Sequence, residues 1–152
     1  MTIEEPRSVV QRREDTLHRL EHDVDLWVAT AEAATGAPAL VPLSFRWDGE
    51  TIMISTAAGS PTARNLSAGG PARLAMGETR DVIMIDCTVA AVVPTTEIPD
   101  EVGDAFAAKA GFDPRQDTDP YLYFSLRPHR IQAWREVNEL SGRTLMIKGR
   151  WR

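Results

Sequence analysis

The chain has 152 residues, enough for one domain with a substantial core but too few for two ordinary domains. Hydrophobic residues make up 43% of it and charged residues 26%, which is globular rather than disordered composition. The net charge of −5 is unevenly spread, because residues 127–152 hold seven basic and only two acidic residues. The remaining body is therefore strongly acidic, which argues against a nucleic-acid-binding protein with a broad basic face.

No apolar run in the sequence reaches the length of a membrane span, and the N-terminal stretch "MTIEEPRSVVQRRED" is charged, unlike a signal peptide. We therefore expect a cytoplasmic protein with no membrane partner. The single cysteine, Cys87, lies in the apolar run "DVIMIDCTVAAVV", where a buried and unreactive thiol is expected.

The first half of the chain predicts one helix and three strands. A helix over residues 6–23 is predicted by an apolar stripe at three- and four-residue steps, which consists of Val9, Val10, Arg13, Leu17 and Leu20. The period then changes, and "DLWVATA" predicts a strand. The stretch "APALVPLSFRWDGETIMISTA" predicts a hairpin that turns at Asp48-Gly49. Pro42 in its first arm indicates an edge, a bulge, or a place where something other than a strand lies alongside.

The second half predicts short helices between further strands. Residues 60–68 and 99–110 predict helices, the latter ended by Gly111, and residues 111–120 predict a loop. The runs "ARLAMG" and "DVIMIDCTVAAVV" predict strands, "YLYFSLRPHRIQAWR" one or two more, and "GRTLMIKGRW" a tail strand. This succession predicts one mainly β domain over residues 1–152, a closed antiparallel barrel with peripheral helices.

The stretch "STAAGSPTARNLSAGG" combines a helix start with several polar side chains. Ser60 is the expected N-cap and Pro61 the first helical residue, so the following backbone N–H groups point out of a helix end that favours negative charge. Thr62, Arg64 and Asn65 can converge on the same point, and long helical side chains lean back toward the N-terminus. The sequence therefore allows an anion-binding site, or else an ordinary capped helix with polar residues facing water.

Residues 24–93, together with "HRIQAWREVNELSGR" more loosely, resemble the split β-barrel flavin-binding family of the pyridoxamine 5′-phosphate oxidases. The order of strand, hairpin, small turn, Ser-x-x-x-x-Asn-Leu on a helix and further strand is similar. The resemblance implies a six-stranded antiparallel split barrel of Greek-key type, a homodimer, and a flavin between the protomers that acts on a small-molecule substrate.

The resemblance also implies which residues would contact that cofactor. Pro42, Leu43 and Ser44 would lie along the isoalloxazine, and Thr56 and Ala57 would touch its polar edge. The phosphate would be bound by Ser60, Thr62, Arg64 and Asn65. Trp134 and Arg143 would lie near the cofactor, from the same chain or from the partner subunit.

The chain departs from the oxidases in ways that leave the cofactor open. The phosphate-binding lysine common in them is absent, and their substrate-binding basic residues cannot be traced, so true pyridoxamine phosphate oxidase activity is not expected. Relatives use FMN or the deazaflavin coenzyme F-420, and others bind heme or have no known activity. Arginine outnumbers lysine 15 to 2, as in high-GC genomes, where deazaflavin-using relatives are frequent. We expect an oxidoreductase that uses FMN or the deazaflavin, with a noncatalytic flavin- or heme-binding protein as the alternative.

Two histidine patterns give weaker signals. His18 and His22 are four residues apart on the first predicted helix, a spacing that can share a metal, but no third ligand is evident and a solvated helix face is favoured. His129 follows Pro128 and fits a structural position at a strand kink, a general acid, or a heme ligand. No metal site is therefore predicted.

Overall fold

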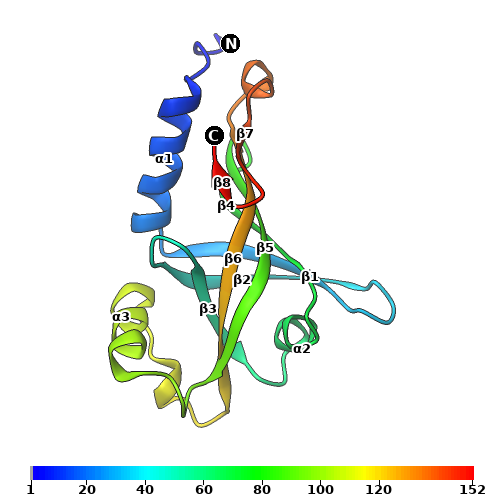
Figure 1. The fold of residues 1–152 in the computed structure, drawn as a ribbon, viewed down its shortest axis with the longest axis vertical. Helices are drawn as coiled ribbons and strands as arrows, with labels where there is room; N and C mark the ends of the chain where they lie inside the picture. The colour runs from blue at the N-terminus through cyan, green and yellow to red at the C-terminus, as the bar shows by residue number, and fades with distance from the viewer. Residues whose placement is uncertain (1) are drawn as a thin grey trace.

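The protein is described here by a computed structural model, which covers residues 2–152 (Figure 1). Within these residues the strands form one eight-stranded antiparallel sheet with three helices around it. The helices are α1 (Val9–His22), α2 (Pro61–Ser67) and α3 (Asp100–Ala110). The strands are β1 (Asp25–Ala31), β2 (Pro38–Trp47), β3 (Ile52–Ala57), β4 (Ala72–Glu78), β5 (Asp81–Pro94), β6 (Tyr121–Trp134), β7 (Thr144–Ile147) and β8 (Arg150–Trp151).

The first six strands close into a barrel. Their order is β3-β2-β1-β4-β5-β6, and β6 pairs back onto β3 through residues 121–126. The remaining strands, β7 and β8, extend the sheet beyond β6 as a small hairpin. The expected mainly β architecture, a six-stranded antiparallel split barrel with short peripheral helices, is confirmed. Closure leaves no free edge in the middle of the barrel, where apolar strands would otherwise be exposed.

Most predicted elements are present with small shifts at their ends. The run "YLYFSLRPHRIQAWR" forms one strand, and the expected tail strand is a hairpin of two strands instead. The predicted loop at 111–120 contains a short 3₁₀ turn, η1 (Pro114–Gln116). Gly111 ends α3 with a φ of 79°, a left-handed conformation that suits glycine.

Pro42 lies where β2 has a strand on one side only. Residues 38–44 pair with β1, whereas pairing of β2 with β3 begins at Phe45, opposite Ile54. A residue without a backbone N–H is tolerated on such an open side. The expectation of an edge-like position is therefore met.

The barrel core follows the alternation of the strands. In β1, Leu26 and Val28 are buried while Trp27 is 48% exposed, because successive side chains point to opposite faces. A second cluster lies under α3, where Phe106 packs edge-on against Tyr123 with 5.4 Å between ring centroids. The expected burial of Cys87 is confirmed, and this burial raises the pKa of its thiol well above the usual value.

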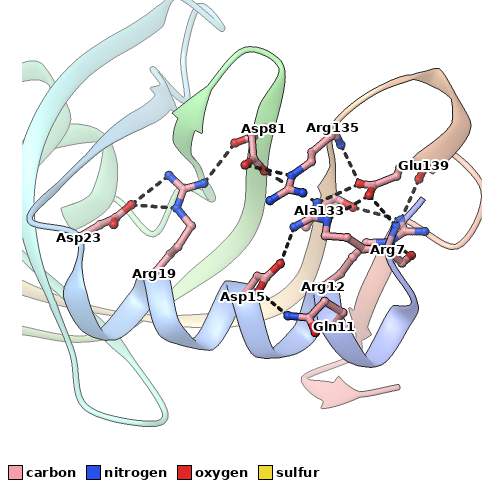
Figure 2. A network of polar contacts seen from close by, with 10 residues as sticks. All are labelled: Arg7, Gln11, Arg12, Asp15, Arg19, Asp23, Asp81, Ala133, Arg135 and Glu139. Atoms are coloured by element: carbon pink, nitrogen blue, oxygen red, sulfur yellow. Dashed lines mark hydrogen bonds and ion pairs between the residues drawn. The ribbon is translucent and has the colours of Figure 1, made fainter. Parts of the chain in front are cut away.

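The predicted stripe of the first helix agrees with its buried face at Leu20 but not at its start. Val9 and Val10 are exposed, and the buried positions of α1 are Arg12, Thr16 and Leu20. Arg12 is only 3% exposed, and its guanidinium donates to four backbone carbonyls, those of Arg7, Ala133, Glu139 and Ser141, at 2.8–3.3 Å. Figure 2 draws all of these residues except Ser141. In the first half of α1, a polar contact to the end of β6 and the segment after it thus takes the place of the apolar contact expected from Val9 and Val10.

Glu139 is the second buried charged group in this contact (Figure 2). It belongs to the 3₁₀ turn η2 (Val137–Glu139), and its carboxylate accepts from the backbone N–H, Nε and Nη2 of Arg7 and from the backbone N–H of Arg135, at 2.8–3.0 Å. These bonds, those of the Arg7 side chain foremost, lower the pKa of Glu139 to about 2. The segment between β6 and β7 is therefore held against the N-terminal segment and α1.

Replacement of Glu139 by glutamine tests this attachment. Glu139→Gln removes the carboxylate that accepts three hydrogen bonds from Arg7 and leaves Arg7 with Asp15 as its near counter-charge, so it should lower the free energy of unfolding by about 1.5–3 kcal/mol, measured by urea denaturation at neutral pH. The folded-state pKa lies below the ordinary value of 4.5, so the contribution is complete above pH 4.5 and is lost as the pH falls through about 2. The difference between wild type and variant should shrink over that window.

Glu136 provides the matched control, since it pairs with Arg80 at the surface. Glu136→Gln should change stability very little. Equal stabilities for Glu139→Gln and wild type would show that the network does not hold the segment.

Candidate functional site

The barrel opens where β2 and β3 separate. Pairing between these strands stops at Phe45 and Ile54, and α2 packs against both strands and against β1 at this point. Six of the predicted site residues surround this opening or follow directly from it: Pro42, Leu43, Ser44, Thr56, Ala57 and Ser60. The fold therefore brings the two predicted ring-contacting segments and the helix start to one end of the barrel.

Ser60 caps α2 as the sequence predicts. Its side-chain oxygen accepts from the backbone N–H of Ala63 at 3.1 Å, and Pro61 is the first helical residue. Its hydroxyl also lies 3.3 Å from that of Thr56, at the end of β3. Thr56 and Ser60 thus form one hydroxyl pair at the mouth of the helix.

Thr62 and Arg64 differ in exposure. Thr62 is 1% exposed, and its buried hydroxyl has no hydrogen-bond partner among residues 2–152. Arg64 is exposed and leans back toward the helix start, where its guanidinium contacts the carbonyl oxygen of Gly59. The structure therefore places the positive charge of Arg64 beside the helix mouth.

Asn65 is turned toward the barrel. It is 8% exposed, and its amide nitrogen donates to the hydroxyl of Thr30 in β1 at 3.0 Å. A hollow of about 460 Å³ lies between α2 and the loop that joins β1 to β2, and Pro61, Arg64 and Asn65 line its helical side. Asn65 thus anchors the helix and borders a space beside Arg64.

The three candidate residues of β2 do not all face the same side of the sheet. Pro42 is exposed, Leu43 packs against the core, and the hydroxyl of Ser44 donates to Asp25 at 2.7 Å. Only Pro42 and Ser44 share the outer face of the sheet, since Leu43 lies between them.

Trp134 and Arg143 lie together but far from the other candidates. The guanidinium carbon of Arg143 is 5.5 Å from the centroid of the Trp134 ring. Thr56 pairs with Leu122 near the start of β6, whereas Trp134 is its last residue. Twelve residues of strand span roughly 40 Å, so one chain does not bring Trp134 to the mouth of α2. In Figure 1, β6 runs from the level of α2 to that of β7.

The two groups are nevertheless linked across the outer face of the sheet. Residues that lie directly opposite each other on paired antiparallel strands point to the same face of the sheet. Consecutive pairs of this kind form one row of residues across five strands. The row is Pro42, Trp27, Ala75, Met84 and Gln132. Its length along the sheet is about 19 Å at the usual spacing between strands. The candidate residues thus border a common surface at its two edges.

This row includes apolar side chains that the sequence analysis did not single out. Trp27 is 48% exposed and Leu40 63% exposed, and together with Ala75 and Met84 they line a hollow of about 330 Å³. We call this surface the outer apolar patch, formed by Trp27, Ala29, Leu40, Arg73, Ala75 and Met84. The period of two along β1 and β2 contained the signal, because Trp27 and Leu40 occupy positions that alternate with core residues.

Residues 2–152 contain no group of three or more histidine, cysteine, aspartate or glutamate side chains placed to bind a metal. His18 and His22 stack on each other with centroids 4.1 Å apart on the exposed side of α1. In the same part of the chain, no helix is both long and apolar enough to cross a bilayer.

The unpartnered hydroxyl of Thr62 leads to a stability prediction. Thr62→Val keeps the shape of the side chain and removes a buried group without a hydrogen bond, so the ligand-free protein should be equally stable or more stable, by up to about 1 kcal/mol. Thr30→Val is the control, because it deprives the Asn65 amide of its acceptor and should cost about 1–3 kcal/mol. Thermal denaturation of both variants measures this, and a clear loss in Thr62→Val would mean that its hydroxyl is bonded in the folded protein.

Comparison with known proteins agrees with this architecture. Among solved structures, an F420 reductase superposes with a TM-score of 0.60 at 19% identity, over 75% of this chain and 93% of that chain. HutZ, the heme storage protein from Vibrio cholerae, gives 0.59 at 16% identity over 84% and 99%. General stress protein 26 from Bacillus anthracis gives 0.57 at 11% identity over 82% and 95%. At these identities the likeness is one of fold, and no curated protein matches the sequence.

The amino-acid sequence shows a more specific relationship than the similarity of fold does. The family model described as pyridoxamine 5′-phosphate oxidase matches residues 18–135, which is more than half of the chain. The matched segment runs from the second half of α1 through the end of β6, so it includes the whole barrel. The chain belongs to the pyridoxamine 5′-phosphate oxidase family of split-barrel proteins.

Proposed function

We propose that the protein is an oxidoreductase that binds FMN or the deazaflavin coenzyme F-420 between two copies of the chain. The observation that carries the proposal is the opening between β2 and β3, with the capped start of α2 and the guanidinium of Arg64 at its mouth. Family membership and the fold shared with an F420 reductase support the same class of cofactor.

The phosphate of the cofactor would lie at the start of α2. Arg64 supplies the positive charge that the oxidases' lysine would give, and Ser60 and Thr56 supply hydroxyls. The buried hydroxyl of Thr62 lacks a partner, and a buried group of this kind is costly unless a ligand atom satisfies it. Asn65 would border the phosphate while it holds the helix on Thr30. The polar groups present here therefore fit an anionic cofactor.

The ring system would lie along the open side of β2. Pro42 and Ser44 present the outer face, Leu43 lies between them, and Thr56 and Ala57 end β3 across the opening. A bound flavin or deazaflavin supplies hydride transfer to or from a small conjugated substrate. The chain's own contribution would be to position the ring, to donate hydrogen bonds to its edge, and to exclude water from one of its faces.

A homodimer would complete the site. The outer apolar patch brings the exposed side chains of Trp27 and Leu40 together around one hollow, and contiguous exposed apolar side chains are typical of an interface. In a two-fold interface the same surface of both copies takes part, and each copy is rotated by half a turn relative to the other. If the axis passes through the middle of the row from Pro42 to Gln132, Pro42 of one copy therefore lies opposite Gln132 of the other. Trp134 and Arg143 would then reach the partner's cofactor.

A second candidate function is noncatalytic binding of a flavin or heme. His129 is exposed and lines a hollow of about 390 Å³ together with Arg73 and Asp86. The HutZ fold is similar to that of this chain, and HutZ is a heme storage protein. In this case His129 would be an axial ligand, and no turnover would accompany binding.

One set of titrations separates these functions. We expect FMN or F-420 to bind, with the visible absorption of a flavin or deazaflavin, and the reduced cofactor to be oxidised when candidate conjugated acceptors are added. Binding without turnover would favour storage, and a heme Soret band that is lost in His129→Ala would favour heme. Failure of both FMN and F-420 to bind would refute the leading proposal.

Arg64→Ala tests the phosphate position. Loss of a charge-assisted hydrogen bond should weaken cofactor binding by about 1.5–3 kcal/mol in a fluorescence titration, and Thr62→Val should show a smaller loss. Arg46→Ala, the same change on β2 instead of α2, is the control. An unchanged affinity in Arg64→Ala would remove this residue from the site.

Leu40→Asp tests the dimer. A buried carboxylate in the centre of the patch should convert the protein to monomers in sedimentation velocity, and cofactor affinity should fall with it because the site loses Trp134 and Arg143 of the partner. Val137 is 71% exposed on η2, outside the patch, so Val137→Asp should leave the dimer intact. A monomeric wild type, or a dimer that survives Leu40→Asp, would contradict the proposed interface.

A further inference from the structure

Two arginines on the outer face near the end of β6 share one neutral partner. The Gln132 side chain is surrounded by hydrogen-bond donors, so its amide oxygen must face them. In that orientation the oxygen accepts from Nη2 of Arg130 at 3.1 Å, from Nε of Arg143 at 3.3 Å, and from the hydroxyl of Thr144 at 3.3 Å. One amide oxygen thus brings two guanidinium groups close together.

The positive charge at this place is not compensated by the chain. Asp86 is the direct cross-strand neighbour of Arg130, but its carboxylate is bound by Arg73 at 2.6 and 3.3 Å. Within residues 2–152, neither Arg130 nor Arg143 forms an ion pair with a carboxylate. Like charges repel at this separation, so the arrangement would be stabilised by an anion that accepts from both groups.

The donors are also held in place. Arg130, Gln132 and Trp134 alternate along β6 and share its outer face, and Arg143 stacks on the Trp134 ring. Arg12 and Glu139 fasten the segment that joins Trp134 to Arg143 (Figure 2). Donors that are ordered before a ligand arrives lose less entropy on binding, which favours recognition of a small anion.

An apolar surface adjoins the two arginines. Gln132 lies directly opposite Met84, which lines the hollow of about 330 Å³ in the outer apolar patch. Trp27 and Leu40 line the same hollow. A ligand that places an anionic group between Arg130 and Arg143 would therefore lay a flat apolar body along the Met84 side of this patch, which in the proposed dimer is the space between the two copies.

We infer that Arg130, Gln132 and Arg143 form a binding site for the carboxylate or phosphate of a planar, otherwise apolar small molecule. Arg130 is the residue that this site adds to those already proposed, and the inference does not require that a flavin binds at α2. The anion can belong to a separate substrate or to a second anionic group of the cofactor, and both sources share the chemistry that the two guanidinium groups recognise.

A matched pair of probes tests the site. 2-Naphthoate and 2-naphthamide have the same aromatic body, but only the former carries a negative charge. In calorimetric titrations of the intact protein, 2-naphthoate should bind at least about tenfold more tightly than the amide, the gain expected from a charge-assisted hydrogen bond. The ratio should fall as salt is added, since the site is partly exposed.

Substitutions locate the binding. Arg130→Gln and Arg143→Gln should each abolish the preference for 2-naphthoate, and affinity for 2-naphthamide should stay within about twofold. Arg127→Gln removes the same charge from an exposed position three residues before Arg130 on β6, and it should keep the preference. Equal affinities of the two probes for wild type, absence of binding by both, or a preference that survives Arg130→Gln would each overturn the inference.

Competition identifies the source of the anion. If FMN or F-420 displaces 2-naphthoate, the site holds an anionic group of the cofactor; if both bind together, it holds a separate anionic substrate. A preserved preference for 2-naphthoate in a protein that binds neither flavin would support the anion site and refute the proposed flavin function.

Discussion

Pairing of β3 with β6 is the interaction on which the rest of the structure depends. It joins residues 52–57 to residues 121–126, segments more than sixty positions apart, and converts an open sheet into a barrel. Such a contact carries a loop-closure cost that local hairpins avoid, and the fully buried side chains of Ile52, Ile54, Phe124 and Leu126 offset it. Because β3 is tied to β6 rather than to the whole length of β2, the open side of β2 and the start of α2 are left together at one end.

Closure of the barrel also explains why the candidate site residues lie in two separate groups, one at the start of α2 and one at the end of β6. β6 pairs with β3 at its beginning and carries Trp134 at its end, so the pairing that fixes the α2 mouth also fixes Trp134 at a distance from it. The buried contacts of Arg12 and Glu139 hold the following segment and prevent it from folding back toward α2. A ligand that touches both groups must therefore lie between two copies of the chain, and the exposed Trp27 and Leu40 offer the surface for that contact.

Local patterns were sufficient to predict much of the fold. The Ser60-Pro61 helix start, the Asp48-Gly49 turn and the Gly111 helix end each depend on the conformational preferences of one or two residues. These preferences do not depend on the tertiary structure. The hairpin of β7 and β8 was missed because its two-residue turn, Lys148-Gly149, has positive φ at both positions without the usual asparagine or aspartate. Burial of Arg12 was missed because nothing in the helix itself reveals the carbonyls of Ala133, Glu139 and Ser141, which come from the far end of the chain and accept from it.

The candidate site was harder to predict for a related reason. The sequence grouped Thr62, Arg64 and Asn65 by their nearness to a helix start, but which of them faces the helix mouth depends on what covers the rest of the helix. The amide of Asn65 donates to Thr30, Thr62 is buried with its hydroxyl unpartnered, and Arg64 is left at the surface. Membership of the family could be predicted from segment order, whereas these orientations depend on contacts between distant strands.

The excess positive charge of the C-terminal segment can pair with the acidic body or can attract an anion. The structure divides the arginines between these two roles. Arg135 donates to the carboxylate of Asp81, whereas the guanidinium groups of Arg130 and Arg143 donate to the neutral oxygen of Gln132. A carboxylate at residue 132 would neutralise both arginines from within the chain, and an amide there orients them without removing their charge. The choice of glutamine therefore keeps an anion-attracting surface at the edge of the outer apolar patch, where the proposed interface between two copies would enclose it.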